Sequence, residues 1–306
     1  MITSRTEARS TEQLHTSHTD PATSVMSTSS EVLDKPYLLH ANAVPFTADG
    51  RVLHLELAVG DVANNIITVG SESRCEILAS LLDKHDTTTA TRDNGNPPPT
   101  FTRRSKRGFV THTGTYNGVP VSIVMINMGY PNMDFLVREI RAVTTGPLRI
   151  VRLGSCAGLR SDLPVGTVAV ASEGSLLIRQ NPDAWGAEVG TETNGGGAVD
   201  PFLFHRVVPA DEGLSRLLLK ELKHALSDEK EAVAVVGCLN ASADSFYSSQ
   251  GRLDPSFEDR NENLIQSLLT RHPSAGTFEM ETFQLLHLAR LCQNSTIRAS
   301  ATSIVV

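Results

Sequence analysis

The sequence has few cysteines, no excess of positive charge and no long hydrophobic run. Its four cysteines form no C-x-x-C pair, which argues against a disulfide framework and against a structural zinc site. A net charge of −7 gives no basic field that would attract nucleic acid. No apolar run approaches the length of a membrane span. We therefore expect a globular cytoplasmic protein that binds neither nucleic acid nor a membrane.

Aliphatic residues are also scarce near the N-terminus, where residues 1–35 are rich in Ser and Thr. Such a segment cannot bury enough apolar surface to offset the entropy lost on ordering, so we expect a disordered tail. Glu7, Glu12 and Asp20 interrupt it, whereas transit peptides are poor in acids. Residues 36–306 are then expected to form one domain.

The first pattern that carries chemistry is a strand, a glycine turn and a helix. The strand-like Ile66–Val69 is followed at once by Gly70, and apolar residues then recur at helical spacing. A glycine lets backbone N–H groups approach an anion, and a helix N-terminus adds a favourable dipole. Arg74 would lie on the first turn, where it could donate to phosphate. Taken alone the pattern is common in α/β proteins.

The middle of the chain predicts a surface insertion, a hairpin and a second anion site. Residues 84–106 carry an NPPP run typical of an insertion, and Asn117–Gly118 predicts the turn of a hairpin within residues 108–131. A helix over 133–143 and a short strand over 149–153 follow. That strand would deliver Arg152, Gly154 and Ser155 to its carboxyl end, where ligands of α/β sheets gather. Ser155 does not fit the G-x-S-x-G pattern of a nucleophilic serine.

The second half of the chain alternates strands and helices. We expect a buried strand within 162–172, a helix over 212–224, a strand over 232–237, a helix over 278–292 and a last strand over 296–306. The glycine-rich segment 179–200, which contains Trp185, is either a lid or a plain insertion. A buried last strand normally has a helix to cover it. Since none follows, we expect this sequence to be shortened at its C-terminus.

Two further groups match the chemistry of a pyrimidine nucleoside. Phe246 offers a flat ring for stacking, Gln250 can both accept and donate to a uracil edge, and Arg252 can donate to the remaining oxygen. In the FEME segment, Glu279 and Glu281 flank Met280, and a carboxylate there could accept ribose hydroxyls. Taken singly, each residue is more often part of a core, a solvated turn or a helix start.

Taken in order, these residues resemble the uridine phosphorylases of the nucleoside phosphorylase I superfamily. The likeness covers residues 52–306, and the insertions point to a protist, kinetoplastid member. It rests on five motifs: H-L at His54, G-x-x-x-R at Gly70–Arg74, R-x-G-S at Arg152–Ser155, F-x-x-x-Q-x-R at Phe246–Arg252, and E-M-E at Glu279–Glu281.

The resemblance implies a three-layer α/β/α fold with a central mixed sheet, and a homodimer or an assembly of dimers. It places phosphate on Gly70, Arg74, Arg152 and Ser155, with Arg107 from the adjacent subunit. It places ribose on Met280 and Glu281, with His54 from the adjacent subunit. Uracil would be stacked on Phe246 and bound by Gln250 and Arg252.

The expected reaction is the reversible phosphorolysis of uridine. Phosphate would attack C1′ through an oxocarbenium-like state, with Arg252, Gln250 and Arg152 as the catalytic residues and with no metal or organic cofactor. Two alternatives stay open. One is a purine nucleoside phosphorylase or a nucleosidase on the same fold; the other is an inactive, shortened homologue.

Three departures from the family pattern accompany the likeness. Ser71 stands where an acid commonly follows the phosphate-loop glycine, and Gly108 stands where bacterial members carry a cation-binding Glu. Gly129–Tyr130–Pro131 replaces a more glycine-rich turn. Purine-specific relatives carry a catalytic Asp just beyond the last residue of this sequence, so pyrimidine preference rests on Phe246, Gln250 and Arg252.

Overall fold

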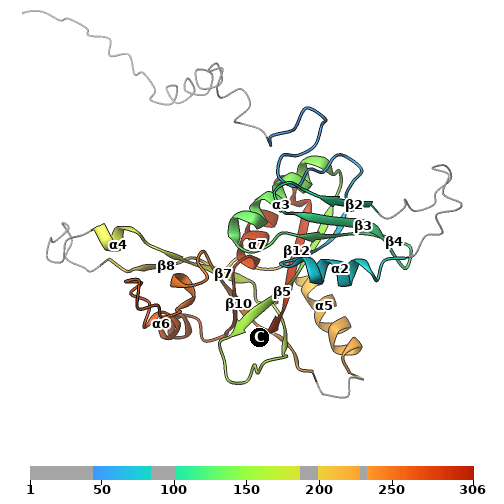
Figure 1. Ribbon diagram of the computed structural model, residues 1–306. Coiled ribbons are helices and arrows are strands. Elements are labelled where there is room, and N and C mark those ends of the chain that lie inside the picture. Colours follow the sequence, from blue (N-terminus) through green and yellow to red (C-terminus); the bar gives the residue numbers. More distant parts are fainter. Residues whose placement is uncertain (1–43, 84–100, 187–198, 228–232) are drawn as a thin grey trace, which may run out of the picture. The chain divides into compact units, whose positions relative to one another are not determined.

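Strand β5 (Leu148–Gly158) is the element around which the computed structural model is built (Figure 1). The structure describes residues 44–83, 101–186, 199–227 and 233–306, and residues 46–306 form one compact unit. The expected tail 1–35 and most of the insertion 84–106 lie outside the described residues. Within the described ranges, no helix is long and apolar enough to cross a membrane.

β5 joins two branches of a mixed sheet. On one edge, its first residues pair in parallel with β1 (Asn65–Val69), and its last two pair antiparallel with β11 (Ala275–Glu279). On the other edge, β12 (Ile297–Val305) pairs in parallel with β5 along nearly the whole length of β5. Its continuous pairing with β12 and the partners at both ends of the other edge satisfy most of the backbone donors and acceptors of β5, so it continues well past the predicted end at Leu153.

The first branch runs from β5 through β1 to a hairpin. Strands β3 (Val110–Tyr116) and β4 (Val119–Met125) are antiparallel, and the turn residues Asn117 and Gly118 have φ values of 49° and 77°. Positive φ at both positions is the backbone of a type I′ turn, which confirms the Asn-Gly prediction. β2 (Phe101–Arg104) pairs with β3, so the end of the expected insertion is a strand.

The second branch continues from β11 through β10 (Leu239–Ala243) and β7 (Ser175–Gln180) to β8 (Phe202–Phe204). Beyond β12, strand β6 (Val168–Val170) pairs with β12 and with β9 (Val235–Gly237). Strands β7, β8 and β10 were not predicted from the sequence. The helix predicted over 278–292 is wrong at its start, because Phe278 and Glu279 end β11.

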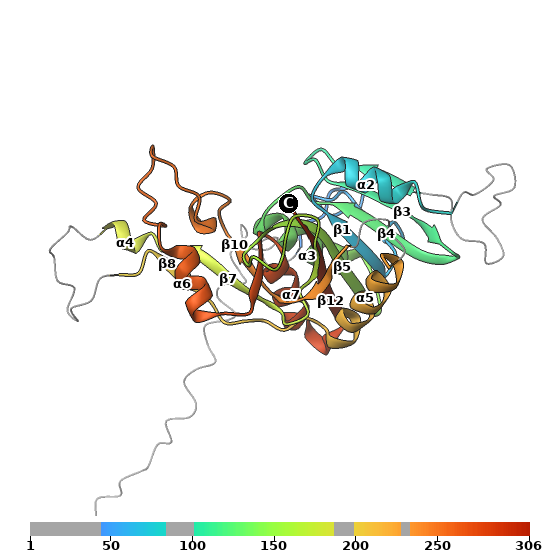
Figure 2. The same ribbon diagram turned by 90° about the horizontal axis from the view of Figure 1, so that it is seen from below.

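Helices pack on both faces of this sheet (Figures 1 and 2). Helix α2 (Glu72–Ala79) covers β1, β3 and β4, while α3 (Tyr130–Val143) packs against α7 (Thr282–Leu291). α7 and α5 (Glu212–Ala225) both pack on β12, and Ser215 of α5 bonds Ser300 at 2.8 Å. The predicted mixed α/β architecture is confirmed.

The remaining helices are short. α6 (Leu264–Arg271) packs beside β10 and β11, and its Leu264 and Leu268 enter the same core as Phe278. α4 (Asp183–Gly186) holds Trp185, whose indole N–H donates to the carbonyl of Glu258 at 2.8 Å. Residues 187–198 lie outside the described part, so the alternatives of a lid and a plain insertion both stay predictions.

Candidate functional site

A cavity of about 470 Å³ opens where β1 ends and β5 continues toward β11. Nine of the predicted site residues line it, although they come from segments far apart in the sequence. They fall into three groups by chemistry, which we call the anion corner (Gly70, Arg74, Arg152 and Ser155), the sugar side (Met280 and Glu281) and the base corner (Phe246, Gln250 and Arg252).

The anion corner begins at the turn between β1 and α2. A Cβ on Gly70 would lie 3.2 Å from both Arg74 Nη2 and the carbonyl oxygen of Asn127, so the turn packs closely against both groups. Arg74 Nε donates to Ser71 Oγ at 3.0 Å. Burial, together with the nearby charge of Arg152, lowers the pKa of Arg74. Two guanidinium groups therefore face one small region, which is favourable when an anion lies between them.

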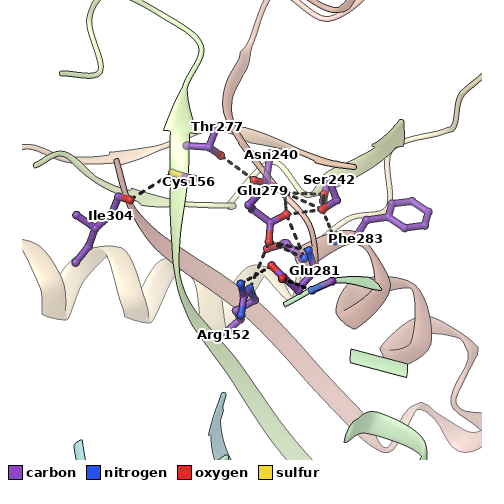
Figure 3. A network of polar contacts seen from close by, with 12 residues as sticks. Arg152, Cys156, Asn240, Ser242, Thr277, Glu279, Glu281, Phe283 and Ile304 are labelled. Atoms are coloured by element: carbon purple, nitrogen blue, oxygen red, sulfur yellow. Dashed lines mark hydrogen bonds and ion pairs between the residues drawn. The ribbon is translucent and has the colours of Figure 1, made fainter. Parts of the chain in front are cut away.

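Arg152 lies within β5 rather than at a strand end, contrary to the sequence prediction. The end of β1 at Val69 pairs with Leu153, and β5 continues beyond this level. Arg152 is 3% exposed and its side chain contacts two carboxylates. Nε donates to Glu279 at 3.3 Å and Nη2 donates to Glu281, while Nη1 has no acceptor among the described residues. Figure 3 shows both carboxylates meeting this one guanidinium.

The carboxylate of Glu279 is fully used inside the protein. It accepts from Ser242 Oγ at 2.5 Å, from Asn240 Nδ2 at 2.9 Å and from the backbone N–H groups of Glu281 and Thr282, both at 3.0 Å (Figure 3). Burial by itself raises the pKa of Glu279, but the charge of Arg152 and these hydrogen bonds outweigh burial and lower it. Glu279 is thus a fixed anion with little capacity left for a ligand.

Glu281 has fewer partners. One oxygen accepts from the Gly129 N–H at 2.6 Å and the other accepts from Arg152. Burial raises the pKa of Glu281 to about 7, with Arg152 lowering it and Glu279 raising it further. Since a carboxylate can accept about four hydrogen bonds, Glu281 keeps capacity that Glu279 lacks. The structure thereby separates two acids that the sequence pattern left equivalent.

The base corner is held together by contacts among its own members. Gln250 ends the 3₁₀ turn η2 (Ser248–Gln250), and Gly251 has a φ of 70°, which turns the chain so that Arg252 folds back. The Gln250 amide donates to the carbonyl of Glu279 at 3.2 Å and accepts from Arg252 Nη1 at 2.6 Å. The Arg252 guanidinium lies 3.6 Å from the centroid of the Phe246 ring. It therefore covers one face of the ring that was expected to stack on a base.

His54 and Arg107 do not line the cavity of their own chain. His54 stacks on Phe135 with a centroid distance of 3.9 Å, and its Nδ1 lies 2.5 Å from Glu139 on α3. Arg107 is exposed on the turn before β3. Their contribution from an adjacent subunit was implied by the resemblance alone and stays a prediction.

Some lining residues were not anticipated: Asn127, Met128, Cys156, Ala157, Phe278 and Val306. Asn127 has a φ of 61° and its amide donates to the carbonyl of Gly108 at 3.1 Å, which joins the turn carrying Arg107 to the cavity wall. An Asn after a predicted strand is a signal for such a left-handed turn. Burial raises the pKa of the Cys156 thiol to about 12, so it stays protonated. The described residues contain no group of acids, His and Cys that could hold a metal ion.

The chain is similar to known proteins over most of its length. A curated uridine phosphorylase of Thermococcus kodakarensis is 27% identical over 252 residues, which cover 81% of this chain and 75% of that protein. A solved uridine phosphorylase structure from the oomycete Phytophthora capsici is 42% identical with a TM-score of 0.74 and covers 87% of both chains. The solved Trypanosoma brucei nucleoside phosphorylase agrees in fold, with 22% identity, a TM-score of 0.64 and coverage of 86% and 90%. The expected kinetoplastid origin stays a prediction.

The family model described as "Phosphorylase superfamily" matches residues 65–305, a range that contains all nine predicted residues of the cavity. The range begins at β1 and ends at the last residue of β12, so it spans every strand of the sheet. The chain belongs to the phosphorylase superfamily.

Proposed function

We propose that this protein is a uridine phosphorylase, which converts uridine and phosphate into uracil and ribose 1-phosphate. The observation that supports this most is the meeting, in one cavity, of the anion corner with the base corner. Two proteins to which the chain is similar over more than four-fifths of its length are named uridine phosphorylases. Phosphate serves as a co-substrate, and the proposed chemistry requires no cofactor.

Phosphate would bind between Arg74 and Arg152, beside the Gly70 turn and the Ser155 hydroxyl. Arg152 Nη1 is a buried donor without an acceptor among the described residues, and a buried donor of this kind normally has one. A phosphate oxygen would supply it. Two guanidinium groups also favour the anionic co-substrate of a phosphorylase over the neutral water used by a nucleosidase.

Ribose would lie on Met280, with Glu281 accepting the hydroxyls. The ionised Glu281 has two occupied positions and further lone pairs, whereas those of Glu279 are taken. The negative charges of Glu281 and phosphate would also stabilise the positive charge that develops on the sugar in the transition state.

Uracil would take the place at Phe246 that Arg252 covers in this structure. Its arrival displaces the guanidinium from the ring face, 3.6 Å away, toward the edge of the base. There Arg252 and the Gln250 amide can donate to ring oxygens. As the C1′–N1 bond breaks, its electron pair passes to uracil while a phosphate oxygen bonds to C1′, and the donors stabilise the departing anion.

We also propose that the active protein is at least a dimer. The family likeness assigns Arg107 and His54 to the site, yet neither lines the cavity of its own chain. Arg107 is exposed, and the side chain of His54 is 20% exposed while its Nδ1 is held by the buried Glu139, so both present surface to a second copy. A partner chain would then complete the anion corner and the sugar side.

The test is the release of free uracil from uridine by the purified protein, with and without phosphate. Uracil should be released only when phosphate is present, and Arg252→Ala should abolish most of this release. Removing a donor to developing negative charge typically lowers kcat by about 10²–10³-fold. Release without phosphate would identify a nucleosidase, and turnover of inosine rather than uridine would identify a purine enzyme. A folded protein inactive in all three assays would contradict the proposal.

A further inference from the structure

Glu279 has a contact pattern that ligand binding does not explain. Each of its oxygens is occupied by donors from the protein: Ser242 and Asn240 on one, and Arg152 with backbone N–H groups on the other. The side chain is 2% exposed, and an ionised carboxylate is an unusual group to bury so completely. Its cationic neighbour is Arg152, which it shares with Glu281.

We propose that Glu279 is a positioning residue: it holds the Nε edge of Arg152, and by sharing this one guanidinium with Glu281 it sets the protonation of the Glu281 carboxyl. This inference rests on the proposed function, in which Glu281 accepts ribose hydroxyls as a carboxylate. Glu279 itself touches no substrate in this scheme. It acts through Arg152 and Glu281.

The charges that face Glu281 come from three elements. Arg152 on β5 contacts it directly, Arg74 on α2 acts from a longer distance, and Glu279 on β11 opposes both. The start of α3 adds the Gly129 N–H at 2.6 Å. Two buried carboxylates thus share one directly bonded cation. Replacing Glu279 by a neutral group leaves Arg152 entirely to Glu281, which makes ionisation of Glu281 easier.

The geometry also fixes the orientation of Arg152. Nε bonds Glu279 and Nη2 bonds Glu281, so both edges of the guanidinium are anchored and Nη1 alone is left without an acceptor in the described residues. Since the guanidinium is planar, two anchored nitrogens determine where the third lies. Loss of the Nε anchor releases the donor that we assign to phosphate.

The experiment compares Glu279→Gln with Glu279→Asp in the full-length protein. Gln keeps the shape but removes the charge, while Asp keeps the charge and shortens the side chain. The pH profile of kcat/KM should lose activity on the acid side as Glu281 is protonated. In Glu279→Gln the acid limb should shift to lower pH by at least about one unit, whereas in Glu279→Asp it should stay near the pH at which it lies in the unmodified protein. A merely structural role would lower activity in both without moving the limb.

A second readout needs no turnover. Infrared difference titration, with Glu281→Gln to identify the band, follows the Glu281 carboxyl directly, and the band should titrate at lower pH in Glu279→Gln. If the unmodified protein releases no uracil, the proposed function fails, and this titration still tests the charge sharing. If Glu279→Gln does not fold, Glu279→Asp should still weaken phosphate binding, seen as a rise in the KM for phosphate of about 10-fold. An unmoved limb and band in folded Glu279→Gln, or an unchanged KM in Glu279→Asp, would overturn the inference.

Discussion

Arg152 takes part in both the buried charge cluster and the cavity wall. It is a buried cation between two buried carboxylates, and it also faces the cavity. Desolvating such groups is costly, and their mutual attraction offsets the cost only while all partners are present. The cluster is therefore a source of function rather than of surplus stability.

Replacing Arg152 by Met should destabilise the protein strongly, because two buried carboxylates lose their cation. Breaking a buried pair typically costs about 3–5 kcal/mol. The loss in the free energy of unfolding should be larger at pH 8 than at pH 6, since Glu281 can be protonated at the lower pH. Urea unfolding at both pH values and one protein concentration measures this. An equal loss at both would contradict ionised carboxylates in the folded protein.

Glu281 should also make the free energy of unfolding depend on pH. Its pKa in the folded protein is raised to about 7, so the folded state binds its proton more tightly than the unfolded chain does. The free energy of unfolding should accordingly fall as pH rises from the ordinary glutamate range to 7, by about 3 kcal/mol, and level off above. In Glu281→Gln this slope should be absent. Glu279, whose pKa is lowered, contributes its pH dependence at more acidic values.

At the scale of elements, the connection from β6 to β7 depends on one tight turn. Gly174 has a φ of 93°, and a Cβ there would lie 2.3 Å from the carbonyl oxygen of Val208. Val208 forms a bridge with Ser175, which places the chain before α5 directly against this turn. Both the backbone angle and the close approach therefore require glycine.

Gly166 provides the matched control for this turn. Its φ of 92° is nearly the same as that of Gly174, but a Cβ there would meet nothing within 4 Å. Gly166→Ala should destabilise the protein by about 1–2 kcal/mol through backbone strain alone. Gly174→Ala should add about 1–3 kcal/mol of overpacking. Thermal unfolding of the two variants measures the difference, and equal shifts in Tm would contradict the packing at Val208.

At the scale of the whole molecule, the proposed dimer can be tested by mixing defects. Arg107→Ala and Arg252→Ala should each be nearly inactive alone. If Arg107 serves the neighbouring chain, a mixed dimer contains one site with both defects and one intact site. Coexpression in equal amounts should restore about a quarter of the full activity, because about half of the dimers are mixed. Size-exclusion chromatography with an assay of each fraction measures this. No recovery in mixed dimers would place Arg107 in its own chain's site, and full activity of Arg107→Ala alone would place it outside any site.

Local patterns in the sequence determined several elements and most of the residues at the cavity. Asn117–Gly118 predicted its turn because positive φ suits those two residues, and the strand–Gly70–helix pattern predicted the start of the anion corner. The motif residues Phe246, Gln250 and Arg252 lie together because a single short turn carries them. Such features depend on neighbours within a few residues, which a sequence displays directly.

Pairing across the sheet decided the rest. β5 is more than twice as long as predicted because β12 lines one edge and β1 and β11 share the other, and such partners cannot be read from the sequence of β5 itself. β7 and β10 likewise depend on their mutual pairing. Glu279 and Glu281 differ in their hydrogen-bond partners because the fold places Ser242 and Asn240 beside Glu279 and Gly129 beside Glu281. The sequence thus identifies which residue types form the site. Contacts between distant segments determine the protonation of its carboxyl groups and the hydrogen-bonding capacity that they keep for a ligand.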